Sequence, residues 1–408
     1  MVPVAGRGGR LGELRRMLTA RADLRSVVLA AVVAWIASRL IAVAITYLAV
    51  SIWANPGHAT AFLKAWNQWD TGSYQSVAAR GYWAPVATAF YPVYPGLIAG
   101  FTWLAGGTHG PAWPAFAPVP LVVALVISNL GALAGLIGLA LLAWNEDRSV
   151  TVARRTVQMA VAYPWAFMLV AGYSEGLFLP EAAFCLLFAR RGRWLACGAV
   201  GLLAGLTRPT ALVLVPAVLW ELIRQRRSAG PDAPSLVRGA VGVSGVPLAI
   251  AGYMGFLWWR FGNPFISLWA ESHYWGRHLA WPWTTAHAIA HVLRAGPHWT
   301  QNEIKIVAIV VAVLAVLAVT LLGLRSMPFA FSLYMLGLIA LSVASPMLTY
   351  YEVIGSAGRF LVVSVPVFLL MGRWISRRPA LDFPVFGLLL VFQAMLAAAY
   401  VIGVDGIQ

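Results

Sequence analysis

Long, uninterrupted apolar stretches recur along almost the whole chain, and they set the first constraint on its fold. A helix needs about 20 apolar residues to cross a bilayer. Because the stretches are continuous rather than alternating, they indicate helices and not the strands of a membrane barrel. The sequence therefore predicts an all-α polytopic membrane protein with about 11 transmembrane helices. The predicted spans are 27–50, 120–143, 156–172, 174–189, 194–207, 209–223, 239–259, 304–323, 328–345, 360–372 and 383–402.

The composition is that of a chain solvated mainly by lipid. Of 408 residues, 61% are apolar and 11% are charged, whereas soluble domains carry about 25% charged residues. Because the apolar stretches continue to the end of the sequence, we expect residues 1–408 to form a single membrane-embedded domain. Cys185 and Cys197 both lie in apolar stretches, so no disulfide framework is predicted.

Positive charge is concentrated in short hinges between the apolar stretches. The formal net charge is +15, and twenty arginines fall in 1–26, 144–155, 189–193, 224–238, 324–326 and 373–378. An excess of arginine is typical of cytoplasmic loops, and its confinement to hinges argues against a nucleic-acid partner. We therefore expect a multi-pass plasma-membrane protein with a cytoplasmic N-terminus. Its outer face should then carry the two catalytic loops, 51–119 and 260–303.

The outer regions are predicted to contain short elements that lie on the membrane surface. Residues 61–80 fit two short amphipathic helices. Residues 88–106 are predicted to be re-entrant or surface-lying, because a span there would move the arginines of 144–155 to the outer face. The apolar stretch 194–223 is broken by the Thr-Arg-Pro turn around Arg208, where two helices should meet near the outer surface.

Asp70 is the most conspicuous polar residue of the first outer region, because it stands alone among tryptophans and tyrosines. The run Asp-Thr-Gly-Ser is a good helix start, so Asp70 could be an N-cap. A carboxylate beside aromatic rings is also partly desolvated, which makes it a better general base. The two interpretations are compatible.

Several short motifs are spread along the chain in a fixed order. They are WDTGSY (69–74) with FYPVYP (90–95), AGYSEGLF (171–178), LTRP (206–209), and GRFL (358–361) with SVPV (364–367). Together they resemble the PIG-V-type mannosyltransferases, which add the second mannose in GPI-anchor assembly, and the bacterial members of that family. Ser73 and Thr210 differ from the residues usual in the family. These differences affect the expected identity of the acceptor more than the expected type of reaction.

This resemblance implies a GT-C glycosyltransferase fold and an inverting transfer of mannose from a polyprenyl-phosphate-mannose donor. The acceptor would be a glycolipid, lipoglycan or glycoprotein on the outer face. In the family the acid of the first loop is the base, so the resemblance gives that role to Asp70. An inverting transfer needs one base for the acceptor hydroxyl. A phosphate leaving group needs positive charge and no general acid.

Two arginines are candidates for binding the donor phosphate. Arg208 and Arg359 each lie at the outer end of an apolar stretch, and arginine is the usual bidentate partner of phosphate. The alternatives are snorkelling to the interface or pairing with a nearby glutamate. Arg39, deeper in the first span, is expected to be structural, with Glu181 as a candidate partner.

Further residues are expected around the substrates. Glu175 could orient an arginine, contact the acceptor, or cap the following helix. Aromatic rings could stack on sugars, although interface anchoring is the alternative for each tryptophan. The expected substrate-binding residues are Trp69, Tyr74, Tyr91, Tyr94, Tyr173, Glu175, His273, Tyr274, Trp275, Arg277, Tyr351 and Glu352.

No cofactor is expected. His287 and His291 have the i, i+4 spacing of metal ligands on a helix, but no third ligand accompanies them. The main alternative function is a transporter or flippase for a lipid-linked or small polar substrate. Such proteins place polar residues near the bilayer midplane and often contain repeats. Here the polar residues gather at outer helix ends and no repeat is evident, which favours the enzyme.

Overall fold

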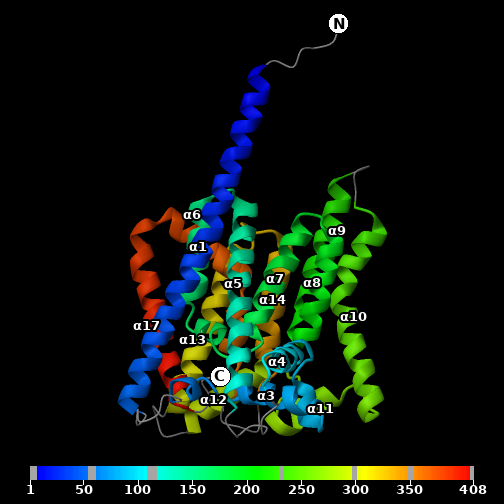
Figure 1. The fold of residues 1–408 in the computed structure, drawn as a ribbon, viewed down its shortest axis with the longest axis vertical. Coiled ribbons are helices and arrows are strands. Elements are labelled where there is room, and N and C mark those ends of the chain that lie inside the picture. Colours follow the sequence, from blue (N-terminus) through cyan, green and yellow to red (C-terminus); the bar gives the residue numbers. More distant parts are fainter. Residues whose placement is uncertain are drawn as a thin grey trace.

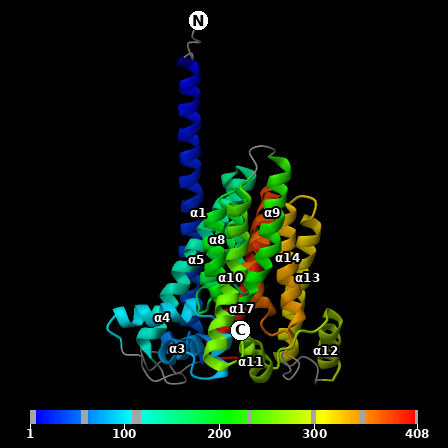
Figure 2. The ribbon, with the colours of Figure 1, turned by 90° about the vertical axis from the view of Figure 1, so that its right-hand side faces the viewer.

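The computed structural model describes residues 7–53, 61–107, 117–229, 234–295, 301–347 and 353–404. Within these ranges the regular elements are helices, and one isolated antiparallel bridge joins Arg277 to Met347. Figures 1 and 2 show the long helices side by side in one bundle, with α1 projecting beyond it toward the N-terminus.

A helix coincides with each of the eleven predicted spans, so the prediction of a polytopic all-α membrane protein is confirmed. Five helices, α1, α5, α10, α13 and α17, are long and apolar enough to cross a membrane unaided, and one bent pair of shorter helices makes a sixth candidate span. The eleven are α1 (Arg7–Trp53), α5 (Pro118–Asp147), α6 (Val150–Ala162), α7 (Glu175–Arg190), α8 (Trp194–Thr207), α9 (Leu214–Ser228), α10 (Leu236–Phe261), α13 (Gln301–Gly323), α14 (Phe329–Ala344), α16 (Val365–Arg377) and α17 (Asp382–Val401).

Prolines explain why the predicted spans 156–172 and 360–372 are not single helices. Tyr163, which follows α6, precedes Pro164 and is extended, as residues before proline usually are. The predicted span 156–172 therefore continues only as the short η2 (Ala166–Leu169). The predicted span 360–372 bends by 70° ahead of α16, which has Pro366 in its first turn. The elements before this bend are α15 (Ala357–Phe360) and η5 (Leu361–Val363).

Short helices cover the end of the bundle that lies away from the N-terminus (Figures 1 and 2). Both predicted outer regions contribute to this cover. α4 has 12 residues, about 18 Å of helix. Figure 2 shows it lying across the bundle end, in agreement with the surface-lying prediction for 88–106. The elements are α2 (Ala61–Lys64), α3 (Asp70–Arg80), η1 (Pro85–Ala89), α4 (Val93–Leu104), α11 (Ile266–Trp275) and α12 (Pro282–Ala295).

Two further short helices complete the connections. The turn η3 (Pro209–Val213) joins α8 to α9, and η6 (Pro379–Leu381) leads into α17. Because Arg208 precedes Pro209, α8 ends at Thr207 and Arg208 is extended, with φ −154° and ψ 144°. The break predicted in 194–223 is therefore confirmed, and it places Arg208 where the two helices meet.

α8 and α10 pack in direct backbone contact. A Cβ atom on Gly245 would lie 2.1 Å from the carbonyl oxygen of Gly198. A Cβ on Gly198 would lie 2.4 Å from the carbonyl oxygen of Val241. Small residues allow such close approach between helices in lipid, where dispersion replaces the hydrophobic effect as the packing force.

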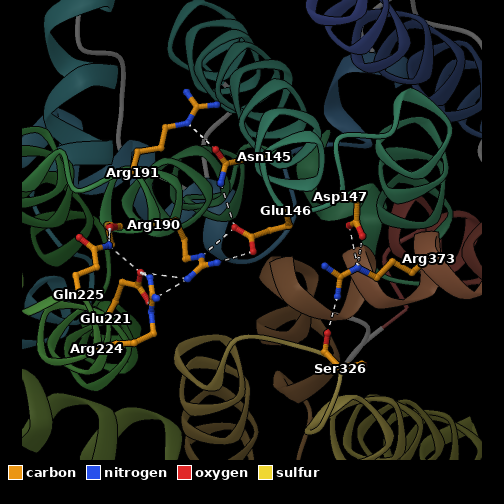
Figure 3. A network of polar contacts seen from close by, with 11 residues as sticks. Asn145, Glu146, Asp147, Arg190, Arg191, Glu221, Arg224, Gln225, Ser326 and Arg373 are labelled. Atoms are coloured by element: carbon orange, nitrogen blue, oxygen red, sulfur yellow. Dashed lines mark hydrogen bonds and ion pairs between the residues drawn. The ribbon is translucent and has the colours of Figure 1, made fainter. Parts of the chain in front are cut away.

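The opposite end of the bundle carries a network of ion pairs (Figure 3). Arg190 of α7 lies 2.8 Å from Glu146 of α5 and 3.1 Å from Glu221 of α9. Arg373 of α16 pairs with Asp147 of α5 at 2.8 Å. These contacts tie together four helices at the arginine-rich end, away from the short surface helices.

Arg39 is held inside the bundle by neutral groups. Its guanidinium donates to the side-chain oxygen of Asn129 and to the carbonyl of Leu169, each at 2.8 Å. The predicted pairing with Glu181 is wrong, because Glu181 instead accepts a hydrogen bond of 2.8 Å from Thr207. Thr207 is the last residue of α8, and its hydroxyl donates to one oxygen of that carboxylate, which the spacing of charges alone does not reveal.

Candidate active site

The backbone at Trp69 determines how Asp70 enters the site. Trp69 has φ 43° and ψ −114°, a conformation that is rare for a bulky residue and marks local strain. Its ring packs against Tyr400 at 5.1 Å between centroids. α3 begins at Asp70 itself, and no side chain caps it, so the N-cap interpretation of Asp70 is wrong. The Asp70 carboxylate instead lies 2.5 Å from Nη1 of Arg359.

Arg208 and Arg359 share one buried carboxylate, that of Glu175. Oε1 of Glu175 lies 2.6 Å from Nη1 of Arg208 and 3.0 Å from Nε of Arg359, and the side chain is only 1% exposed. Arg208 also donates to the hydroxyl of Ser174 at 3.0 Å. Glu175 starts α7, but the helix has no side-chain cap. Of the three roles predicted for Glu175, contact with an arginine is the one seen in the structure.

Three guanidinium groups surround the ring of Phe360. The Cζ atoms of Arg208, Arg277 and Arg359 lie 5.3, 5.4 and 5.4 Å from its centroid. Cations within about 6 Å of an aromatic face are attracted by the ring quadrupole. The ring of Phe360 thus attracts three guanidinium groups, which partly offsets the repulsion between their positive charges.

These side chains line a polar cavity of about 100 Å³ at the covered end of the bundle. Its wall comes from six separate segments of the chain. With Glu175 behind it, the site contains three arginines and three carboxylates. The lining residues used below are Asp70, Tyr74, Tyr91, Arg208, Glu271, Trp275, Arg277, Arg359 and Phe360.

Glu271 of α11 is a pocket carboxylate that was not among the expected site residues. Its nearest cation is Arg277 at 3.7 Å, and its side chain remains 34% exposed. Burial raises the pKa of Glu271 above its ordinary value, while the positive charge of Arg277 opposes this shift. Arg277 in turn donates to the hydroxyl of Ser356. Glu271 is therefore the least tightly paired acid of the cavity.

The cavity tyrosines are neutral hydrogen-bonding groups. Burial raises the pKa of Tyr91 to about 12, and the charge of Glu271 adds to the effect. Burial likewise raises the pKa of Tyr74 above its ordinary value. The Tyr74 hydroxyl lies 2.7 Å from the hydroxyl of Ser174, which links it to Arg208.

Other expected substrate-binding residues lie behind or beside the cavity. Tyr94 donates to the carbonyl of Ala124 and packs edge-on against Tyr74, with centroids 4.8 Å apart. Tyr173 lies under Arg359, with 5.1 Å from the guanidinium carbon to its ring. These two tyrosines support the wall and do not line it.

At the C-terminal end of α11, some of the expected residues line the cavity and others lie outside it. Trp275 lines the cavity, whereas His273 stacks on Trp269 with centroids 4.5 Å apart and does not line it. Tyr274 is partly exposed and also lies outside the lining. Tyr351 and Glu352 fall outside the described residues. Within the described part of the chain, no group of three or more His, Cys, Asp or Glu side chains could hold a metal ion.

The similarity of this chain to known proteins is seen in its structure and not in its sequence. No protein-family model and no curated protein sequence matches the chain. It is similar to ArnT from Cupriavidus metallidurans bound to undecaprenyl phosphate, with a TM-score of 0.50 and 14% identity over 88% of this chain and 63% of ArnT. The apo oligosaccharyltransferase of Archaeoglobus fulgidus gives a TM-score of 0.38 and 12% identity, over 91% of this chain and 55% of that one.

The chain has the GT-C glycosyltransferase fold. It spans less than two thirds of the length of ArnT. Within this GT-C fold the polar cavity lies at the end covered by the short helices of both predicted outer regions.

Proposed function

We propose that the protein is an inverting glycosyltransferase that uses a polyprenyl-phosphate sugar as donor. The motifs at 69–95, 171–178, 206–209 and 358–367 favour mannose and a PIG-V-type enzyme. The acceptor would be a glycolipid, lipoglycan or glycoprotein on the outer face of the plasma membrane, with the N-terminus in the cytoplasm. The observation that carries the proposal is the contact between Asp70 and Arg359 at the edge of a cavity that holds two further arginines.

Asp70 would act as the general base. Its carboxylate accepts the proton of the acceptor hydroxyl while that oxygen forms a bond to the anomeric carbon of the donor sugar. The bond between this carbon and the phosphate oxygen breaks, and its electron pair leaves with the phosphate. Attack from the face opposite to the leaving group inverts the configuration. The hydrogen bond from Arg359 fixes the direction of the Asp70 carboxylate.

The arginines would stabilise the departing phosphate. Arg208, Arg277 and Arg359 all line the cavity, and guanidinium groups bind phosphate through paired, charge-assisted hydrogen bonds. Charge held in place before the reaction stabilises the transition state without reorganisation. The undecaprenyl phosphate bound by ArnT supports a lipid-phosphate donor for this fold.

The test is transfer of labelled mannose from polyprenyl-phosphate-mannose to membrane lipid extract by the purified protein. Asp70→Asn is compared with Asp147→Asn, which makes the same change in an ion pair with Arg373 at the other end of the bundle. We expect Asp70→Asn to lower kcat by about 10²- to 10⁴-fold, the usual contribution of a general base. Asp147→Asn should keep more than half of the activity.

Two results would count against the proposal. If Asp70→Asn transfers mannose as fast as the wild type, Asp70 is not the base. If the folded wild-type protein transfers no sugar but moves the lipid-linked sugar across reconstituted vesicles, the protein is a flippase.

A further inference from the structure

A second polar cavity, of about 500 Å³, lies at the arginine-rich end of the bundle, away from the candidate active site. Its walls are the first turn of α8, the last turns of α9 and the first turn of α10. The lining residues that matter here are Trp194, Arg224, Gln225 and Arg238. The proposed sugar transfer uses none of them.

The described lining of this second cavity carries positive charge without an acid. Arg224 and Arg238 are its charged residues. Arg224 donates through both Nε and Nη2 to Glu221, which also pairs with Arg190 outside the cavity, so its charge is already balanced. Arg238 is exposed and forms no ion pair with any described residue. The cavity therefore favours an anion.

A buried hydrogen-bond donor in the same wall has no partner. Trp194 is 3% exposed, and its indole Nε1 donates to no described group. Leaving such a donor unpaired is costly. Gly192, which also lines the cavity, adopts φ +66°, and a Cβ there would lie 3.9 Å from Nε1. The absence of a side chain at Gly192 leaves space beside this donor.

Apolar side chains continue from the cavity along the outside of the bundle. They lie on α8 and α10, the two helices that pack in backbone contact, and they are exposed to the surrounding medium. A ligand that fits both surfaces has an anionic head and hydrocarbon chains. The exposed residues are Leu195, Leu202 and Leu203 of α8 and Val237, Val241 and Leu248 of α10.

We propose that this second cavity binds the headgroup phosphate of an anionic phospholipid. Arg238 neutralises the phosphate, and the indole N–H of Trp194 donates to one of its oxygens. The acyl chains lie against the exposed leucines and valines of α8 and α10. Basic pockets between membrane helices are known sites for anionic headgroups.

The experiment measures lipid binding to the delipidated, full-length protein in detergent by native mass spectrometry. Phosphatidylglycerol is compared with phosphatidylcholine of the same chain length. We expect phosphatidylglycerol to bind at least 10-fold more tightly. Arg238→Gln and Trp194→Phe should each weaken its binding at least 5-fold, since they remove a charge and a donor. The matched control is Arg260→Gln, at the other end of α10, which should change the affinity less than 2-fold.

Three outcomes would overturn this assignment. Equal affinity for the two lipids would show that no anionic site exists. Complete displacement of the lipid by millimolar inorganic phosphate would show that the cavity binds soluble phosphate. Asp232 lies in 230–233, outside the described residues. If only Asp232→Asn creates selectivity for phosphatidylglycerol, that aspartate neutralises the cavity in the wild-type protein.

Discussion

Arg359 donates a 2.5 Å hydrogen bond to Asp70, although 289 residues separate the two in sequence. The contact joins the surface helix α3 to the bent segment that leads into α16. Because Nε of Arg359 also lies 3.0 Å from Glu175, one guanidinium balances two carboxylates from different parts of the chain. The candidate site therefore forms only when these distant segments of the chain come together in the folded bundle.

Removing Arg359 should destabilise the protein through the charges that it leaves behind. Breaking one side of a buried ion pair costs about 3–5 kcal/mol, so Arg359→Gln should lower the free energy of unfolding by about 3 kcal/mol. Asp70→Asn added to it should recover part of that loss, because it removes an unpaired carboxylate. Thermal unfolding of the two single variants and the double variant closes a mutant cycle. If the effects simply add, the contact does not couple the two residues.

Phe360 is predicted to position the three arginines of the cavity. Phe360→Leu keeps an apolar side chain but removes the aromatic quadrupole, which is worth about 0.5–2 kcal/mol for a cation. We expect the donor KM to rise about 10-fold, with a smaller change in kcat. Phe360→Trp keeps a π face and should stay near the wild-type KM. Initial rates over a range of donor concentrations give both constants, and equal KM values for the two variants would contradict the prediction.

Glu271 should make the stability of the protein depend on pH. Burial raises its pKa above the ordinary value of 4.5, so the folded state holds this proton more tightly than the unfolded state. The stability that protonated Glu271 contributes is complete below pH 4.5 and is lost as the pH rises through the raised pKa. Glu271→Gln keeps a neutral side chain and avoids that loss.

The measurement for Glu271 is the difference in Tm between Glu271→Gln and the wild type across pH 4–8. We expect this difference to grow as the pH increases. A difference that does not change with pH would mean that Glu271 ionises as easily in the fold as in the unfolded chain.

The course of the helices is predictable because it depends on local properties of the sequence. Apolar stretches of sufficient length identify the spans, and Pro164, Pro209 and Pro366 identify the breaks. The limits of single helices are less predictable. The stretch 156–172 is mostly apolar, yet its backbone leaves the helix at Tyr163 because of the following proline.

The candidate site is predictable only where a motif marks it. Asp70, Arg208 and Arg359 belong to such motifs, and all three line the same cavity. Glu271 belongs to none of these motifs. Phe360 belongs to GRFL, but nothing local predicts that its ring lies beside three arginines, because Arg208 and Arg277 come from segments distant in sequence. Glu181 shows the same limit, since its partner is the hydroxyl of Thr207 and not Arg39. The surroundings of these residues are set by tertiary contacts, which the local sequence does not show.

The close approach of α8 and α10 gives a prediction with a control in the same helix. Gly245→Ala would bring a Cβ to 2.1 Å from the backbone of Gly198, so the two helices must separate. Overpacking of this kind costs about 1–3 kcal/mol. Gly252→Ala, also in α10, meets no atom within 4 Å and should leave the Tm unchanged or raise it slightly, because alanine favours the helix. Thermal unfolding in detergent compares the two variants. Equal Tm values would show that α8 and α10 are not in backbone contact at Gly198.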